Sequence, residues 1–212
     1  IECNDPKHIT LKYNANKAYE EYLRTKEAFK GNVKLKFGIE IGQATQNYML
    51  AEETINSREY DFVIGSLHNS RTEDDFYFID FKKADINTLL TKYYNEVYEL
   101  CRWGKFNVLG HITYFLRYSY VQGVNIDIKP FMPVITEILK HLIYTGKGIE
   151  VNTSGLRGEL AETSPNLDLI KLYRLLGGEI ITVGSDAHRA CDVSKGIKEG
   201  YELIKTAGFN HI

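Results

Sequence analysis

Short apolar runs and amphipathic helical patterns alternate along this chain, and this alternation limits its fold more than any other feature. Runs with the length of buried strands lie at 35–41, 61–68, 107–111, 148–152 and 179–184. The spacing of apolar residues and the capping signals predict helices at 14–30, 44–57, 85–101, 132–145, 164–176 and 194–206. Repeated strand–helix units of this kind predict an α/β fold with a parallel sheet, open or closed into a barrel.

Length and composition narrow the class of protein further. The 212 residues suffice for a sizeable core and contain no linker-like stretch, so we expect a single domain over 1–212. A net charge of −2 without a basic cluster argues against a nucleic-acid partner, and no apolar run approaches the roughly 20 residues that span a bilayer. Cys3, Cys101 and Cys191 are odd in number and far apart, which predicts reduced thiols and a cytoplasmic protein.

Polar side chains follow the predicted strands at the point where each strand ends. They are Glu40, His68, His111, Asn152, and Asp186 with His188. The carboxyl ends of parallel strands meet at one edge of the sheet, where α/β proteins place their chemistry. Carboxylates and imidazoles grouped there can share a divalent metal ion. A single histidine at a strand end is usually only a hydrogen-bonding residue, and S-D-A-H alone could be a capped turn. The recurrence at equivalent places favours a metal site.

Together these motifs resemble the polymerase and histidinol phosphatase (PHP) superfamily, and within it the monofunctional HisK-type histidinol-phosphatases. The resemblance rests on G-I-E (38–40), S-L-H (66–68), G-H (110–111), E-V-N-T-S-G-L-R (150–157) and G-S-D-A-H (184–188), and it runs from about Phe37 to Ala207. It implies an irregular (β/α)7 TIM-like barrel with up to three divalent ions, Zn, Mn or Fe, at its C-terminal rim. Carried over, Glu40 would bridge two ions, His68 and His111 would bind one of them, Asp186 the other, and His188 a third.

One element of the family pattern is missing from this sequence. Members begin with an H-x-H motif on the first strand, and this chain contains none. Because such a barrel needs about 250 residues, we expect that the first strands and the H-x-H ligands belong to a missing N-terminal piece of about 40 residues. A natural variant without them is the alternative.

The resemblance and the metal chemistry together predict a mechanism. Divalent ions lower the pKa of a bridging water and neutralise phosphate oxygens. Arg157, Arg189 and, as a third candidate, Arg117 would bind the phosphate through their planar forks, although each could instead form a surface ion pair. Asp186 or a metal-bound water would protonate the leaving alkoxide. Asp186 and His188 are thus the expected catalytic residues.

The expected reaction is the hydrolysis of L-histidinol phosphate to L-histidinol and phosphate, a step of histidine biosynthesis. The acidic and aromatic loop at 71–78 could bind the ammonium and imidazole groups of this substrate, or could be a solvated turn. Two alternatives stay open: a PHP phosphoesterase for another ester, such as a nucleotide or a DNA 3′ end, and a non-catalytic PHP-like domain.

Overall fold

All five predicted strands form and pair in chain order. The computed structural model describes residues 13–211, so Cys3 lies outside the described part. The sheet is parallel with the order β1-β2-β3-β4-β5. The strands are β1 (Gly38–Gly42), β2 (Phe62–Ser66), β3 (Val108–Leu109), β4 (Gly148–Asn152) and β5 (Ile181–Gly184). Parallel pairing follows from the helical crossover between each strand and the next.

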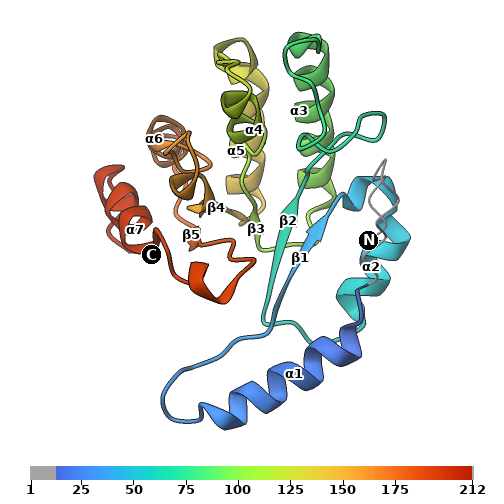
Figure 1. The fold of residues 1–212 in the computed structure, drawn as a ribbon, viewed down its shortest axis with the longest axis vertical. Helices are drawn as coiled ribbons and strands as arrows, with labels where there is room; N and C mark the ends of the chain where they lie inside the picture. The colour runs from blue at the N-terminus through green and yellow to red at the C-terminus, as the bar shows by residue number, and fades with distance from the viewer. Residues whose placement is uncertain (1–12, 212) are drawn as a thin grey trace.

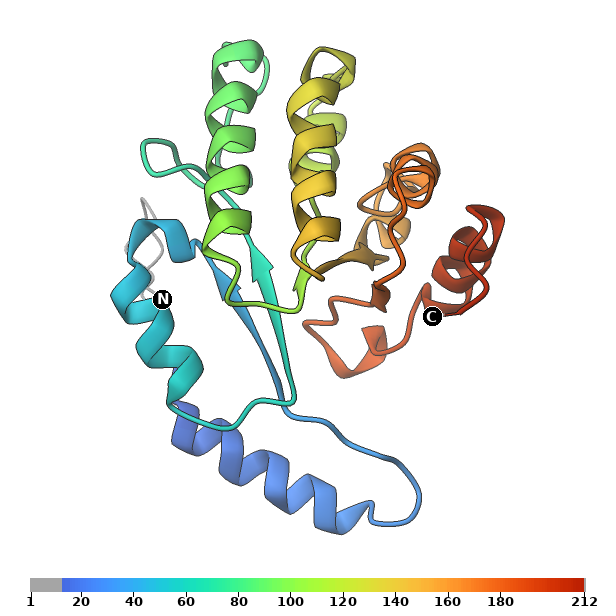
Figure 2. The same cartoon turned by 180° about the vertical axis from the view of Figure 1, so that it is seen from behind.

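The helices fan out around the outer side of the strands (Figure 1). They are α1 (Ala15–Ala28), α2 (Tyr48–Asn56), α3 (Ile86–Trp103), α4 (Leu116–Val121), α5 (Met132–Tyr144), α6 (Leu167–Leu175) and α7 (Ile197–Thr206). Figure 2 shows α3 and α5 side by side, and they are in contact. Helix α1 lies apart from this layer, across the N-terminal ends of β1 and β2 (Figure 1), and none of its residues is buried.

The core lies between the strands and this helical layer. Side chains alternate along a strand, so Ile149 and Val151 of β4 join the buried core cluster while Glu150 and Asn152 face the opposite, concave side of the sheet. Phe76, Tyr93 and Phe115 contribute edge-to-face and tilted ring contacts to the same core. Apolar packing on the helix-covered side therefore stabilises the sheet, and the opposite, concave side carries polar side chains.

The five strands form an open sheet within residues 13–211. β1 and β5 each pair along one edge only in this part of the chain. This open parallel sheet is compatible with a partial TIM-like barrel.

Several predicted helix boundaries were wrong. The helix expected over 44–57 is split, because the side chain of Asn47 caps a new helix by accepting from Leu50 N at 3.0 Å. The helix expected from Ser164 begins at Leu167, since Asn166 is the cap and Ser164 pairs with Asn152 in a β-bridge. The last helix begins at Ile197 rather than at residue 194, and α4 was not predicted. In residues 13–211 no helix combines the length and apolar character that a membrane crossing requires.

Candidate metal centre

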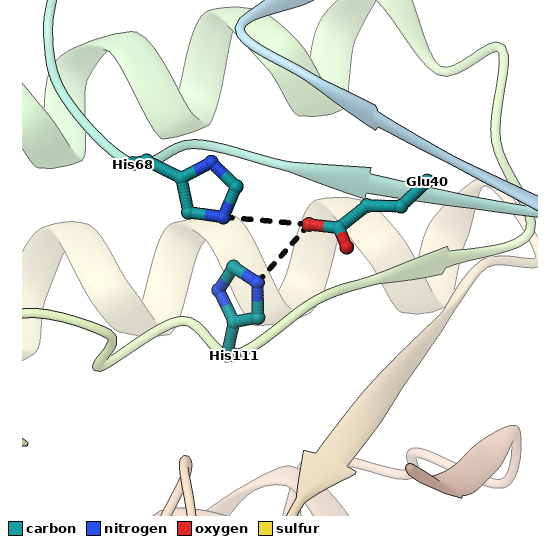
Figure 3. A group of neighbouring side chains, drawn as sticks. All are labelled: Glu40, His68 and His111. Carbon is teal, nitrogen blue, oxygen red and sulfur yellow. Dashed lines mark hydrogen bonds and ion pairs between the residues drawn. The ribbon is translucent and has the colours of Figure 1, made fainter. Parts of the chain in front are cut away.

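Three predicted ligands from three neighbouring strands converge near the C-terminal edge of the sheet. Glu40 lies on β1, and His68 and His111 each come two residues after the last residue of β2 and β3. One ligand atom from each of the three lies within 4.8 Å of the others. Glu40 Oε1 is 3.4 Å from His68 Nε2 and 3.2 Å from His111 Nε2 (Figure 3).

Neighbouring residues fix the orientation of this group. Ser66, on the strand next to Glu40, donates its hydroxyl to Glu40 Oε1 at 2.5 Å. The ring of Tyr114 packs beside both imidazoles, with centroid distances of 4.6 Å to His68 and 5.0 Å to His111. The three ligands are thus held before any ion arrives, which lowers the cost of binding one.

The electrostatics of the group suit a cation. Burial opposes ionisation of Glu40, but hydrogen bonds from His111 and His68 outweigh it and hold the pKa of this carboxyl far below its usual value. Burial likewise favours the neutral ring of His111, yet the hydrogen bond to Glu40 and the charges of Glu40, Glu150 and Asp186 raise its pKa above 6.5. A site that attracts a proton in this way also attracts a metal ion.

The donor set fits a divalent metal. Imidazole nitrogen and carboxylate oxygen are ligands for Zn, Mn and Fe. His111 Nδ1 is buried and has no hydrogen-bond partner in the described residues. A buried polar atom without a partner is uncommon, and it belongs to a side chain whose other nitrogen faces the carboxylate.

Asp186 and His188 form a separate pair at the end of β5. Asp186 Oδ1 lies 3.2 Å from His188 Nε2, and the His188 side chain is 86% exposed. The five predicted ligands therefore fall into a group of three and a pair. Arg117 joins the two, because it lies 3.6 Å from Asp186 Oδ2 and its guanidinium stacks 4.5 Å from the centre of the Tyr114 ring.

The three predicted arginines follow the ends of β3, β4 and β5, but they differ in environment. Arg157 donates to the carbonyl oxygens of Ser185 at 2.5 Å and Asp186 at 3.0 Å, so it holds the backbone of a predicted ligand. Arg117 donates to Ser154 Oγ at 2.8 Å and to a tyrosine hydroxyl at 2.7 Å. Arg189 is exposed.

In the acidic loop at 71–78, Asp75 contacts Tyr114, whose ring packs against the two histidines of the site. Asp75 Oδ1 accepts from the hydroxyl of Tyr114 at 3.5 Å and from the Tyr77 N–H at 2.8 Å. Glu73 instead pairs with Lys92 at 2.5 Å, and Asp74 is exposed. Tyr114 therefore connects Asp75 with the two histidines of the group.

Sequence reasoning missed Glu150. This residue of β4 is 5% exposed, and burial raises the pKa of its carboxyl despite the opposing effect of His111. Only Asn152 was considered in this strand because it marks the strand end. A carboxylate between Ile149 and Val151, in a run predicted as a buried strand, was the signal that could have identified it.

The chain is similar to a known family and to several known proteins. The family model described as PHP domain matches residues 6–154, which include Glu40, His68 and His111 but not Asp186 or His188. The histidinol-phosphatase of Lactococcus lactis subsp. lactis (strain IL1403) is 28% identical over 204 residues, which are 94% of this chain and 74% of that protein. A Clostridium acetobutylicum protein named "Probable histidinol-phosphatase" is 25% identical over 215 residues, 100% of this chain and 81% of the relative.

A solved structure has the same fold. It is the crystal structure of histidinol phosphate phosphatase (HISK) from Lactococcus lactis complexed with Zn, L-histidinol and phosphate. The two chains superpose with a TM-score of 0.76 at 24% identity, over 98% of this chain and 79% of the other.

Proposed function

The chain belongs to the PHP domain family, and from this premise we propose that it is a metal-dependent histidinol-phosphatase, which hydrolyses L-histidinol phosphate to L-histidinol and phosphate. The observation that carries the proposal is the group of Glu40, His68 and His111, whose ligand atoms lie within 4.8 Å of one another. The names of the curated relatives support the substrate.

The metal ions are proposed to lie at two places on the C-terminal edge of the sheet. Glu40, His68 and His111 hold one ion, and Asp186 with His188 holds another. The zinc in the similar Lactococcus structure supports zinc, while manganese and iron suit the same donors, and the family allows up to three ions. A bound divalent ion lowers the pKa of water and neutralises phosphate oxygens.

The protein's own groups position the phosphate and supply the proton. Arg157 and Arg189 approach the phosphate oxygens from beyond β4 and β5, and Arg117 approaches from α4. The carboxylate of Asp186 accepts a proton from the water that attacks phosphorus and passes it to the leaving oxygen as the P–O bond breaks. Arg117, 3.6 Å from Asp186 Oδ2, keeps the carboxylate directed to this place.

Asp75 and Tyr114 are proposed to bind the cationic end of the substrate. L-Histidinol phosphate carries an ammonium and an imidazole group a few bonds from its phosphate. The Tyr114 ring stands between the two histidine ligands and Asp75, so a substrate whose phosphate lies at the ligands can direct its cationic end along this ring toward Asp75. Carboxylate and aromatic faces both attract such cations.

Phosphate release from a panel of esters tests the proposal. Metal-free protein is supplied with Zn²⁺ or Mn²⁺ and offered L-histidinol phosphate, p-nitrophenyl phosphate, a nucleoside monophosphate and a 3′-phosphorylated oligonucleotide. We expect metal-dependent turnover with kcat/KM for L-histidinol phosphate about 100-fold above the other esters. The Asp186→Asn variant serves as the control that loses activity.

Each other outcome identifies an alternative. Faster turnover of the nucleotide or the oligonucleotide would replace the substrate by another phosphate ester. No turnover of any ester by protein shown to contain its metal would favour a non-catalytic PHP-like domain. A place in histidine biosynthesis follows from the proposed substrate, whereas the single domain over 1–212 and the cytoplasmic location stay predictions.

A further inference from the structure

Glu150 is a buried carboxylate that takes no part in the metal binding, phosphate binding or proton transfer proposed so far. The other buried glutamate of residues 13–211, Glu96, accepts short hydrogen bonds of 2.6 and 2.8 Å from Thr45 Oγ1 and Arg71 N. Glu150 accepts two long ones, both 3.4 Å, from His111 N and Asn152 Nδ2. A buried carboxylate with such weak partners is unfavourable for folding, so its place needs another explanation.

The carboxylate lies against the ends of the two strands that flank β4. A Cβ on Gly110 would lie 3.6 Å from Glu150 Oε2, and a Cβ on Gly184 would lie 2.1 Å from Glu150 Oε1. Gly110 directly precedes His111, and Gly184 lies two residues before Asp186. Glu150 therefore fills a gap between the segment that carries His111 and the segment that carries Asp186. Position 184 must be glycine, because any Cβ there would overlap the Glu150 carboxylate.

The backbone of these segments needs such support. His111 has φ of +21° and Asp186 has φ of +47°, which are uncommon for residues other than glycine. Conformations of this kind persist where surrounding contacts hold them, and they occur often at functional sites. The N–H of His111 faces Glu150 Oε2 at 3.4 Å, and the same oxygen lies beside Gly110, so the carboxylate restrains this backbone by its position as well as by the long hydrogen bond.

We propose that Glu150 is a positioning residue of the metal centre, which fills the gap between Gly110 and Gly184 and holds the His111 backbone so that the His111 ring points at Glu40. This inference rests on the metal site of the proposed function and is independent of the substrate. It requires the shape of the side chain and an acceptor oxygen, and it does not require the negative charge.

Zinc affinity tests the proposal directly. The dissociation constant of Zn²⁺ is measured by competition with a chromophoric chelator for the wild type, Glu150→Gln and Glu150→Ala. Glutamine keeps the shape and an acceptor oxygen, so we expect its affinity to stay within about 3-fold of the wild type. Alanine removes both, and we expect a loss of about 10- to 100-fold, as is typical for residues that orient a metal ligand.

Val151→Ala is the matched control. Val151 is the next residue of the same strand, is fully buried on the opposite, helix-covered side, and should lose stability without loss of zinc affinity in the folded protein. If Glu150→Ala does not fold, Gly184→Ala replaces it, because the added Cβ displaces the carboxylate while Glu150 remains; the expected loss of affinity is the same.

A second measurement separates this inference from the proposed function. Amide hydrogen exchange of His111, followed by NMR in metal-free protein, should be faster in Glu150→Ala than in the wild type and Glu150→Gln. Equal zinc affinity in wild type and Glu150→Ala would overturn the proposal, and so would an equal loss in Glu150→Gln and Glu150→Ala. If the wild type bound no zinc, the metal site itself would fail, and the exchange rates alone would decide whether Glu150 holds His111.

Discussion

At the scale of single residues, Glu40 connects the group, because its Oε1 contacts both histidine ligands. We expect Glu40→Gln to weaken zinc binding by more than the roughly 10- to 100-fold that loss of an outer partner costs. Phosphate release should fall in parallel. Glu137→Gln is the matched control, since Glu137 is exposed and pairs only with Lys140 in the described residues. Unchanged zinc affinity in Glu40→Gln would show that Glu40 is not a ligand.

The opposite pKa shifts of Glu40 and His111 predict how the stability of the metal-free protein depends on pH. The pKa of His111 is raised in the folded state, so its contribution to stability is fully present below its unfolded value of about 6.5 and is lost as the pH rises through the raised value. The opposite shift of Glu40 gives a contribution that is present above about pH 4.5 and is lost only in strong acid. Between pH 6 and pH 8 the contribution of Glu40 therefore stays constant while that of His111 falls.

We expect the free energy of unfolding of the metal-free wild type to fall from pH 6 to pH 8 by more than that of His111→Asn. Urea unfolding at both pH values measures the difference. Equal pH dependence of the two proteins would mean that His111 does not take up a proton next to Glu40.

The ligand group could be predicted from the sequence because polar residues at the ends of parallel strands meet at one edge of the sheet. His68 and His111 each close an apolar run and Glu40 lies near the end of one, and parallel pairing brings such positions together. Glu150 lies inside a strand, and its role depends on Gly110 and Gly184 of the neighbouring strands, which no single run contains. The separation of Asp186 and His188 from the group depends on loop geometry that periodicity does not describe.

At the scale of elements, the loop after β2 carries His68 and is held by α3. Glu96 of α3 accepts from Thr45 Oγ1 at 2.6 Å and from the Arg71 N–H at 2.8 Å, so it connects the segment after β1 with the segment after His68. The carboxylate is buried, whereas Glu99, one turn away, is 46% exposed and pairs with the same arginine at 2.7 Å.

Removing these two carboxylates should have different costs. Glu96→Ala leaves a buried hydroxyl and a backbone N–H without their acceptor, and we expect a loss of about 1–3 kcal/mol in the free energy of unfolding. Glu99→Ala removes a surface ion pair worth about 0–1 kcal/mol. Urea unfolding of both variants checks the difference. Equal losses would contradict the view that buried Glu96 holds this loop.

Element types were predictable where a long stripe of apolar residues faces the core, as in α3 and α5. The boundaries were not, because local side-chain caps decide them. Asn47 and Asn166 each start a helix by accepting an N–H three residues on, and both lie beside other residues that could have served as caps. The short helix α4 has too few residues for a periodic pattern to identify it.

At the scale of the whole molecule, metal binding should stabilise the fold. The ligands come from β1 and from the segments after β2 and β3, so an ion at the group joins parts of the chain that are distant in sequence. At a free Zn²⁺ concentration of about 100 times Kd, binding adds about 2.7 kcal/mol, which corresponds to a rise in Tm of about 5–10 °C for a domain of this size. Thermal unfolding with and without a chelator measures the rise, and Glu40→Gln should show less of it. An unchanged wild-type Tm would contradict a site of this affinity.

The position of a bound zinc ion is the sharpest test of the three proposed ligands. Crystals grown with Zn²⁺ and measured at the zinc absorption edge give the ion's place from anomalous scattering. We expect an anomalous peak about 2.0–2.2 Å from Glu40 Oε1, His68 Nε2 and His111 Nε2. A well-occupied zinc elsewhere, with these three side chains still bonded only to one another, would contradict it.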